Sequence, residues 1–211
     1  MVKLNEIYVL NRALDGAEIY ALPKLDVPLS DFLISSVKDG LIGKKILSTH
    51  KSFTDEGVLL TQRINLYKTA TKYISLNQTT IGFLDKNKGI ALTYNPYFDT
   101  YAFNMVSTED IVSSLTEVYA FLQEDGEVVD EHEESIAFDV LKERYPIERK
   151  KSLVLKTKSE ELETHEEVFL ANNQFYLYNH KEETLARKNK ENLLDTIQER
   201  VKAHESNISS T

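Results

Sequence analysis

Residues 73–122 read YISLNQTTIGFLDKNKGIALTYNPYFDTYAFNMVSTEDIVSSLTEVYAFL, and this stretch decides the fold. β-Branched and aromatic residues gather in four short runs, which predict strands at 73–76, 80–84, 90–94 and 101–106. The loop 85–89 joins the second run to the third, and Gly89 is expected to offer the positive φ that a short hairpin loop needs. An antiparallel meander is therefore expected.

An amphipathic helix is predicted directly after the meander, over 108–122. Ser107 is placed as its N-cap, and Val106 has the spacing to pack on Ile111 as a hydrophobic staple. Apolar residues then recur at spacings of four, three and four, which predicts one buried stripe: Ile111, Leu115, Val118 and Leu122.

The same order of elements returns about 80 residues later. Strands are predicted at 153–157, 167–171, 174–178 and 184–187, followed by a helix over 190–204. The dipeptide Asn172-Asn173 suits a type I′ hairpin turn, because Asn tolerates left-handed backbone. Two such copies predict an α+β fold with a pseudo-twofold repeat of meander-plus-helix units. The alternative is chance, since many α+β domains contain a meander followed by a helix.

Helices are also expected outside the two copies. The N-terminal ones are predicted over 3–14, over 29–37 with Gly40 as the stop, and over 54–67 with Thr54 as the cap. A further short helix is predicted over 135–144, before Pro146.

A run of seven carboxylates over 123–134 is typical of a solvated connector. The predicted domains are therefore an N-terminal α+β half at 1–122, the acidic connector at 123–134, a C-terminal α+β half at 135–205 and a disordered tail at 206–211.

Composition narrows the classes of function. The 211 residues contain no cysteine, which argues against disulfides and cysteine-ligated metals, and the net charge of -9 disfavours nucleic acid and anionic lipid. The N-terminus has no secretory apolar stretch, and no apolar run reaches the roughly 20 residues of a spanning helix. A cytoplasmic protein without membrane insertion is expected.

With this layout, the chain resembles the EspG-like chaperones of bacterial type VII secretion, in their firmicute (EsaE-like) branch. The resemblance covers residues 1–122, and in the second half only the order of elements agrees. It implies a pseudo-twofold α+β protein that holds secreted substrates soluble in the cytosol. It is carried by these segments: Leu4-x-x-Ile7-x-x-Leu10, Leu22-Pro23-x-Leu25, Lys38-Asp39-Gly40-Leu41-Ile42, the helix from Thr54, Tyr73-Ile74-Ser75-Leu76, the Ile81 to Tyr94 hairpin, and Val106-Ser107-Thr108-Glu109-Asp110.

The histidines give little sign of chemistry. The densest cluster surrounds His132, which has carboxylates on both sides but lacks the second nitrogen ligand and the i, i+4 helical spacing of a zinc site. His165 and His180 flank predicted strands and are interpreted as loop residues. We therefore predict no catalytic residue, no metal, no cofactor and no enzyme activity, with a hydrolase that uses His132 as the remote alternative.

The aromatic connection between the third and fourth predicted strands is different in kind. Four rings lie within eight residues around Pro96: Tyr94, Tyr97, Phe98 and Tyr101. Tyrosine and phenylalanine rings are common anchors at protein interfaces, so these four are the predicted partner-binding residues. The alternative is that they cover the sheet core.

The leading functional hypothesis is a cytosolic chaperone for a secreted substrate or toxin of a type VII system, released at the secretion ATPase. The alternative is an immunity protein that occludes a basic toxin, which the net charge of -9 favours.

Overall fold

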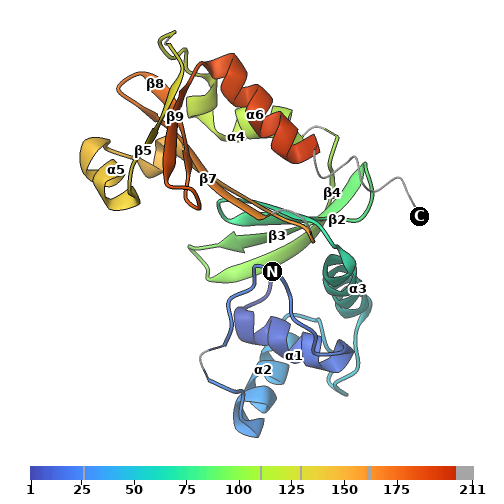
Figure 1. Ribbon diagram of the computed structural model, residues 1–211. Coiled ribbons are helices and arrows are strands. Elements are labelled where there is room, and N and C mark those ends of the chain that lie inside the picture. Colours follow the sequence, from blue (N-terminus) through green and yellow to red (C-terminus); the bar gives the residue numbers. More distant parts are fainter. Residues whose placement is uncertain (26, 110, 129, 161–162, 203–211) are drawn as a thin grey trace. The chain divides into compact units, whose positions relative to one another are not determined.

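The computed structural model describes residues 1–25, 27–109, 111–128, 130–160 and 163–202. The chain divides into two compact units (Figure 1). Unit 1 consists of Met1–Ala70, Gln78–Leu84 and Gly89–Val106, and unit 2 consists of Thr71–Asn77, Asp85–Lys88 and Ser107–Thr211. Helices and antiparallel strands occur in both, so the α+β class and the N-terminal helices are confirmed.

Unit 1 combines three helices with three strands. The helices are α1 (Leu4–Leu14), α2 (Asp31–Gly43) and α3 (Asp55–Thr69), and the strands are β2 (Thr79–Phe83), β3 (Lys88–Asn95) and β4 (Thr100–Ser107), in the order β4-β3-β2. β2 and β3 are antiparallel, with Ile81 opposite Ala91. α3 packs on these strands through the Tyr67 ring, which meets Phe103 edge-on at 5.6 Å. The N-terminus is tied to β4 by backbone bonds between Val2 and Tyr101.

The start of α3 is set by local chemistry that the sequence predicts. The Thr54 hydroxyl accepts a hydrogen bond from the Gly57 amide at 3.1 Å, as an N-cap should. The buried face of the helix consists of Gly57, Thr61, Ile64 and Tyr67. Val58, Leu59 and Leu66 lie on the opposite face and are exposed.

The described residues of unit 2 form six strands in the order β1-β6-β7-β8-β9-β5, with every adjacent pair antiparallel. The strands are β1 (Tyr73–Leu76), β5 (His132–Ser135), β6 (Ser152–Lys158), β7 (Glu163–Ala171), β8 (Gln174–Asn179) and β9 (Thr184–Lys188). The Asn172-Asn173 turn is confirmed: both residues have positive φ, and Ala171 lies opposite Gln174.

Helices cover both faces of this sheet. α4 (Ile111–Val118) and α6 (Lys190–Lys202) contact each other on one face, and α5 (Phe138–Arg144) lies on the other (Figure 1). α6 is fixed to the unit by the buried residues Leu193, Ile197 and Val201. Leu141 of α5 packs with Phe169 and Tyr178. Short 3-10 turns at Ala120–Gln123 and Arg149–Lys151 complete the unit.

Three helix predictions are wrong in their limits. The second helix does not stop at Gly40 but runs to Gly43. The helix predicted over 108–122 is shorter, because α4 begins at Ile111 and ends at Val118. The helix does not begin at Thr108, because this residue binds the loop between β2 and β3 instead. The Thr108 amide donates to the Asn87 carbonyl, and the Thr108 hydroxyl donates to the Lys86 carbonyl. The predicted N-cap, Ser107, is instead the last residue of β4.

The third error concerns the helix predicted over 135–144, where the chain first forms the edge strand β5 and α5 starts only at Phe138. The acidic segment 123–134, expected to connect two halves of the chain, lies within one unit of the structure. These residues belong to unit 2 and end in β5, which pairs with β9, so the division into units does not fall there. The predicted tail at 206–211 lies outside the described residues.

The order of four strands and a helix occurs twice, as the repeat hypothesis requires. In the first copy, however, β1 belongs to unit 2 while β2, β3 and β4 fall almost entirely in unit 1. The pseudo-twofold relation therefore stays a prediction, and a superposition of 153–204 on 73–122 tests it.

Candidate functional site

The loop that joins β3 to β4 presents two aromatic rings to solvent. The Tyr97 side chain is 92% exposed and Phe98 is 68% exposed. Their backbone is fixed by an Asx turn, in which the Asn95 carboxamide oxygen accepts from the amides of Tyr97 (3.0 Å) and Phe98 (3.4 Å). The loop thus holds both rings outward without burying either, so the core interpretation is wrong for this pair.

The base of the same hairpin uses the other two rings as structure. Tyr101 is 6% exposed, and its ring lies 4.9 Å from the Tyr94 ring, centroid to centroid. The Tyr94 hydroxyl donates to the Asp99 carboxylate at 3.1 Å, and this bond raises the pKa of Tyr94. Burial raises the pKa of Tyr101. The four predicted partner-binding residues therefore divide into an exposed pair at the tip and a packed pair beneath it.

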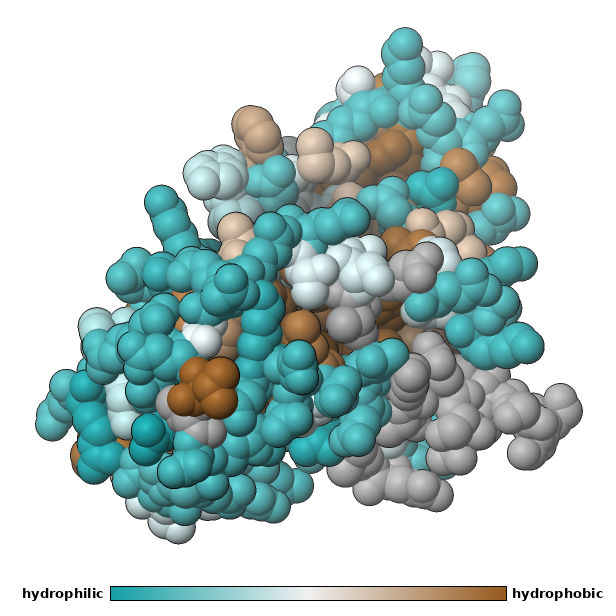
Figure 2. Space-filling model, turned by 90° about the horizontal axis from the view of Figure 1, so that it is seen from above, coloured by the Kyte–Doolittle hydropathy of each residue, from teal (hydrophilic) through white to brown (hydrophobic). Residues whose placement is uncertain are grey.

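Helix faces in unit 1 carry further exposed apolar side chains that sequence reasoning did not single out as a surface. Phe32 on α2 is 81% exposed, and Val58, Leu59 and Leu66 form the outer stripe of α3. The sequence holds a signal for α3, because Leu59 and Leu66 lie opposite the buried Gly57, Thr61 and Ile64 on a helical wheel. The face of the molecule seen in Figure 2 is mostly hydrophilic, with apolar side chains visible in separate places.

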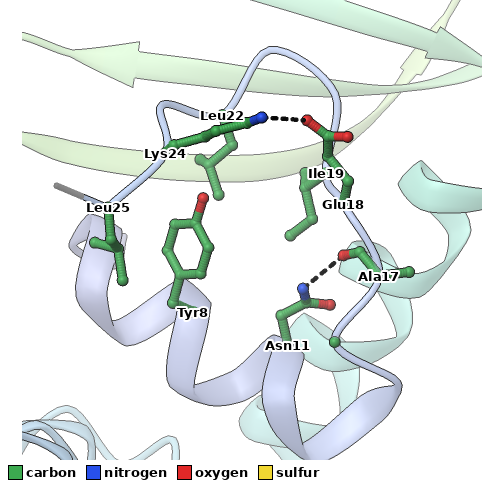
Figure 3. Close-up of a pocket in the computed structure, with 9 residues that line it drawn as sticks. Tyr8, Asn11, Ala17, Glu18, Ile19, Leu22, Lys24 and Leu25 are labelled. Carbon is green, nitrogen blue, oxygen red and sulfur yellow. Dashed lines mark hydrogen bonds and ion pairs between the residues drawn. The ribbon is translucent and has the colours of Figure 1, made fainter. Parts of the chain in front are cut away.

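A cavity of about 320 Å³ lies in unit 1 between α1 and the loop 16–25 (Figure 3). Tyr8 and Asn11 contribute one side, and the buried side chains of Ile19 and Leu22 point inward from the loop. The loop is tied to α1 by two hydrogen bonds: Tyr8 donates to the Pro23 carbonyl at 2.9 Å, and the Asn11 amide donates to Ala17 at 2.8 Å. These two hydrogen bonds hold the loop against α1, so the fold itself fixes the residues that line the cavity.

In unit 2 the structure brings His165 and His180 together. Their rings stack at 4.1 Å between centroids, and His180 Nε2 lies 3.3 Å from a Glu167 carboxylate oxygen. Burial, the neighbouring His180 and Lys156 lower the pKa of His165 to about 4. Sequence could have paired them, because a two-residue turn at 172–173 places residue 165 opposite residue 180.

The remaining histidines do not join this cluster. His132 lies on the edge strand β5, where its Nδ1 is 3.3 Å from the Arg187 guanidinium, and His50 is exposed in unit 1. His204 lies outside the described residues. Among the described residues, no group of three or more His, Asp or Glu side chains is arranged to hold a metal ion.

Across the described ranges, no helix has both the length and the apolar character needed to cross a membrane.

Comparison with known proteins gives one family. The family model described as "Domain of unknown function (DUF5081)" matches residues 1–200. No curated protein matches the chain.

Proposed function

Since the chain belongs to the DUF5081 family, whose description names no activity, we propose a function from the chain's own surface and sequence: a cytosolic chaperone for a secreted protein. The partner is a substrate or toxin of a type VII secretion system, which the chaperone keeps soluble until it reaches the secretion ATPase. Binding is an equilibrium in which the chaperone covers an apolar patch of its client, and no cofactor takes part.

The observation that carries this proposal is the hairpin tip. Tyr97 and Phe98 expose large aromatic surfaces although neither supports the core. A ring that becomes buried in an interface contributes roughly 1–4 kcal/mol of binding free energy. The Asx turn and the Tyr94–Asp99 hydrogen bond order the tip before binding, which lowers the entropy lost on association.

The proposal is tested by substituting the tip in the full-length chain. Tyr97→Ala and Phe98→Ala should each weaken binding of the client by more than about 1 kcal/mol, a factor of about five. The melting temperature should stay within a few degrees, because exposed side chains contribute little to stability. Phe32→Ala, which removes an equally exposed ring from α2, is the matched control and should leave binding unchanged.

Client capture is measured by affinity purification from the native cytosol, followed by titration of the recovered protein with each variant. If both tip variants fold normally and bind as well as the parent chain, the tip is not the binding surface and the proposal loses its support.

The second candidate is an immunity protein that occludes a basic toxin, and the net charge of -9 favours it. The two roles separate on deletion of the gene. A chaperone is needed for export of its partner, whereas loss of an immunity protein leaves export intact and exposes the cell to the toxin.

A further inference from the structure

The outer edge of β4 is covered at its start and open after it. Tyr101 exchanges two backbone hydrogen bonds with Val2: its amide donates to the Val2 carbonyl at 2.7 Å, and its carbonyl accepts from the Val2 amide at 3.0 Å. In an antiparallel ladder every second residue points its amide and carbonyl to the same side, so Phe103 and Met105 direct theirs to this edge as well. For the Met105 backbone, no partner on this side is found among the described residues. The edge thus accepts an antiparallel segment, but Val2 covers only its first part.

The open part of β4 also lacks the side chains that protect edge strands. The sequence of the strand, TYAFNMVS, contains no charged residue and no proline, and Asn104 and Met105 are exposed. β5 is the other edge strand, and it carries Glu133 and Glu134. Charged side chains are a common means by which edge strands avoid pairing with other chains. Of the two edges, β4 is therefore the one that admits an added strand.

A row of three side chains on α3 borders this edge. Arg63 donates from Nη1 to the outward-facing carbonyl of Phe103 at 3.2 Å, so its side of α3 is turned toward the edge. The residues four positions before and three positions after Arg63 are its neighbours on the helix surface, and these are Leu59 and Leu66. Both leucines are exposed. The edge is thus bordered by an apolar, a cationic and again an apolar side chain, which we call the α3 row.

The cation of the α3 row has no acidic partner. Among the described residues Arg63 makes no ion pair, and its Nε is buried without a hydrogen-bond partner. Lys44 and Lys68 of the same unit, by contrast, are paired with Glu6 and Asp15. A guanidinium binds a carboxylate through charge-assisted hydrogen bonds. The group that fits beside Arg63 is therefore an acid, although the net charge of the whole chain is -9.

The spacing of the α3 row resembles that of the side chains of an extended strand. At a rise of about 1.5 Å per residue, Leu59 lies about 6 Å before Arg63 along the helix and Leu66 about 4.5 Å after it. Side chains on one face of a strand are about 6.8 Å apart. A strand with the pattern apolar-x-acidic-x-apolar therefore offers one matching side chain to each member of the row.

We infer that β4 binds an extended segment of the client as an additional antiparallel strand, with the acidic side chain of this pattern on Arg63 and the apolar ones on Leu59 and Leu66. Backbone hydrogen bonds to Phe103 and Met105 provide affinity, and the α3 row provides sequence preference, the division of roles found in strand addition generally. The inference rests on the proposed function only for the identity of the protein that supplies the segment.

The test uses the purified full-length chain, labelled with ¹⁵N, and three synthetic peptides. The first is acetyl-Thr-Leu-Thr-Glu-Thr-Leu-Thr-amide, the second has Gln in place of Glu, and the third has Ala in place of both Leu. The first should shift the amide signals of residues 102–106 and 59–66 in a saturable manner. The glutamine peptide should bind about twofold to fivefold more weakly, the range of an exposed ion pair. The alanine peptide should bind at least about tenfold more weakly, because it buries less apolar surface.

Substitutions separate the two parts of the surface. Arg63→Gln should abolish the preference for the glutamate peptide over the glutamine peptide, whereas Arg12→Gln, the same change of charge at an exposed position of α1, should retain it. Met105→Pro removes the outward-facing amide and should weaken the first peptide more than Met105→Ala, which keeps that amide. Thermal melts identify any variant that fails to fold, and the comparison of the three peptides on the parent chain needs no variant.

Equal binding of the three peptides, shifts confined to residues outside α3 and β4, or no shifts at all would overturn the inference. Analytical ultracentrifugation examines a second copy as the occupant: a parent dimer that Met105→Pro dissociates would also overturn it. Because these measurements need no secreted partner, a failed edge leaves capture through the hairpin tip standing. Conversely, a failed chaperone proposal leaves the peptide result intact.

Discussion

The ion pair between the buried Glu166 of β7 and the partly exposed Arg200 of α6 offers a quantitative test of the packing in unit 2. Glu166 is 2% exposed and accepts three hydrogen bonds from Arg200: one from Nη2 at 2.8 Å, and two from Nε at 3.1 and 3.3 Å. Arg200 is followed by Val201, one of the residues that fix α6 to the sheet. Arg200→Met keeps much of the side-chain volume but leaves a buried carboxylate without a partner.

The expected loss follows from that burial. Removing one member of a buried pair lowers the free energy of unfolding by about 3–5 kcal/mol, because the remaining charge is neither hydrated nor compensated. The double variant Glu166→Leu/Arg200→Met should regain most of this loss, since an apolar pair has no charge to desolvate. The pair Arg144–Glu134, which is about half exposed, provides the control: Arg144→Met should lower the stability by less than about 1 kcal/mol.

Urea unfolding followed by far-UV circular dichroism gives all four free energies by linear extrapolation. The reasoning is refuted if Arg200→Met is no more destabilising than Arg144→Met, or if the double variant is as unstable as Arg200→Met alone.

Three further predictions concern other parts of the chain. Because the pKa of His165 is about 4 in the folded state and about 6.5 when unfolded, the unfolded chain binds the proton first on acidification. Stability should therefore fall between pH 6.5 and 4, by roughly 1 kcal/mol for this partly exposed ring, and urea midpoints for His165→Gln should show a smaller change over that range. Gly57→Ala should lower the stability by about 1–3 kcal/mol in the same assay, because the added Cβ would overlap the Ile46 carbonyl oxygen; Gly43→Ala, where nothing lies within 4 Å of the added atom, is the control. Elemental analysis of the purified chain should find no stoichiometric zinc, iron or manganese, and one bound equivalent would overturn the prediction of a protein without a metal.

Strands with strong local signals could be predicted to within a few residues at most ends. β8 and β9 follow from the Asn172-Asn173 turn and from alternating apolar residues, and both appear where expected. β5 could not be predicted, because its sequence HEES contains no apolar residue and the strand is defined by backbone pairing with β9. An edge strand of this composition has no hydrophobic period to detect.

A glycine caused the error in the second predicted helix. Gly40 resembles a helix stop, yet α2 continues through it. A Cβ at this position would lie 3.4 Å from a carboxylate oxygen of Glu6, a buried residue that pairs with Lys44 at 2.6 Å. Gly40 thus lies where α2 contacts α1, and the continuation of the helix depends on tertiary contacts that a sequence window does not contain.

The sequence predicts where the aromatic hairpin tip lies but not which of its rings are exposed. The residues Asn95 and Pro96 mark the turn, so the position of the aromatic hairpin tip follows from the sequence. Which rings face solvent depends on how Tyr101 packs against Tyr94 and how Val2 pairs with β4. The cavity beside α1 was not foreseen at all, because its walls come from a helix and an irregular loop whose path is set by side-chain-to-backbone hydrogen bonds.

The acidic run bears on the choice between chaperone and immunity protein. As a free connector, its seven carboxylates would form a strip able to steer a basic toxin. In the structure most of them are engaged within unit 2, by these ion pairs: Glu124–Lys151, Asp125–Lys190, Glu131–Lys188 and Glu134–Arg144. Each cation cancels much of the field of its partner, so the run contributes less to long-range attraction than its composition suggests. The acidic run is then a weaker argument for toxin binding, although the net charge of -9, which already counts these cations, is unchanged. The exposed rings of Tyr97 and Phe98 support the chaperone proposal.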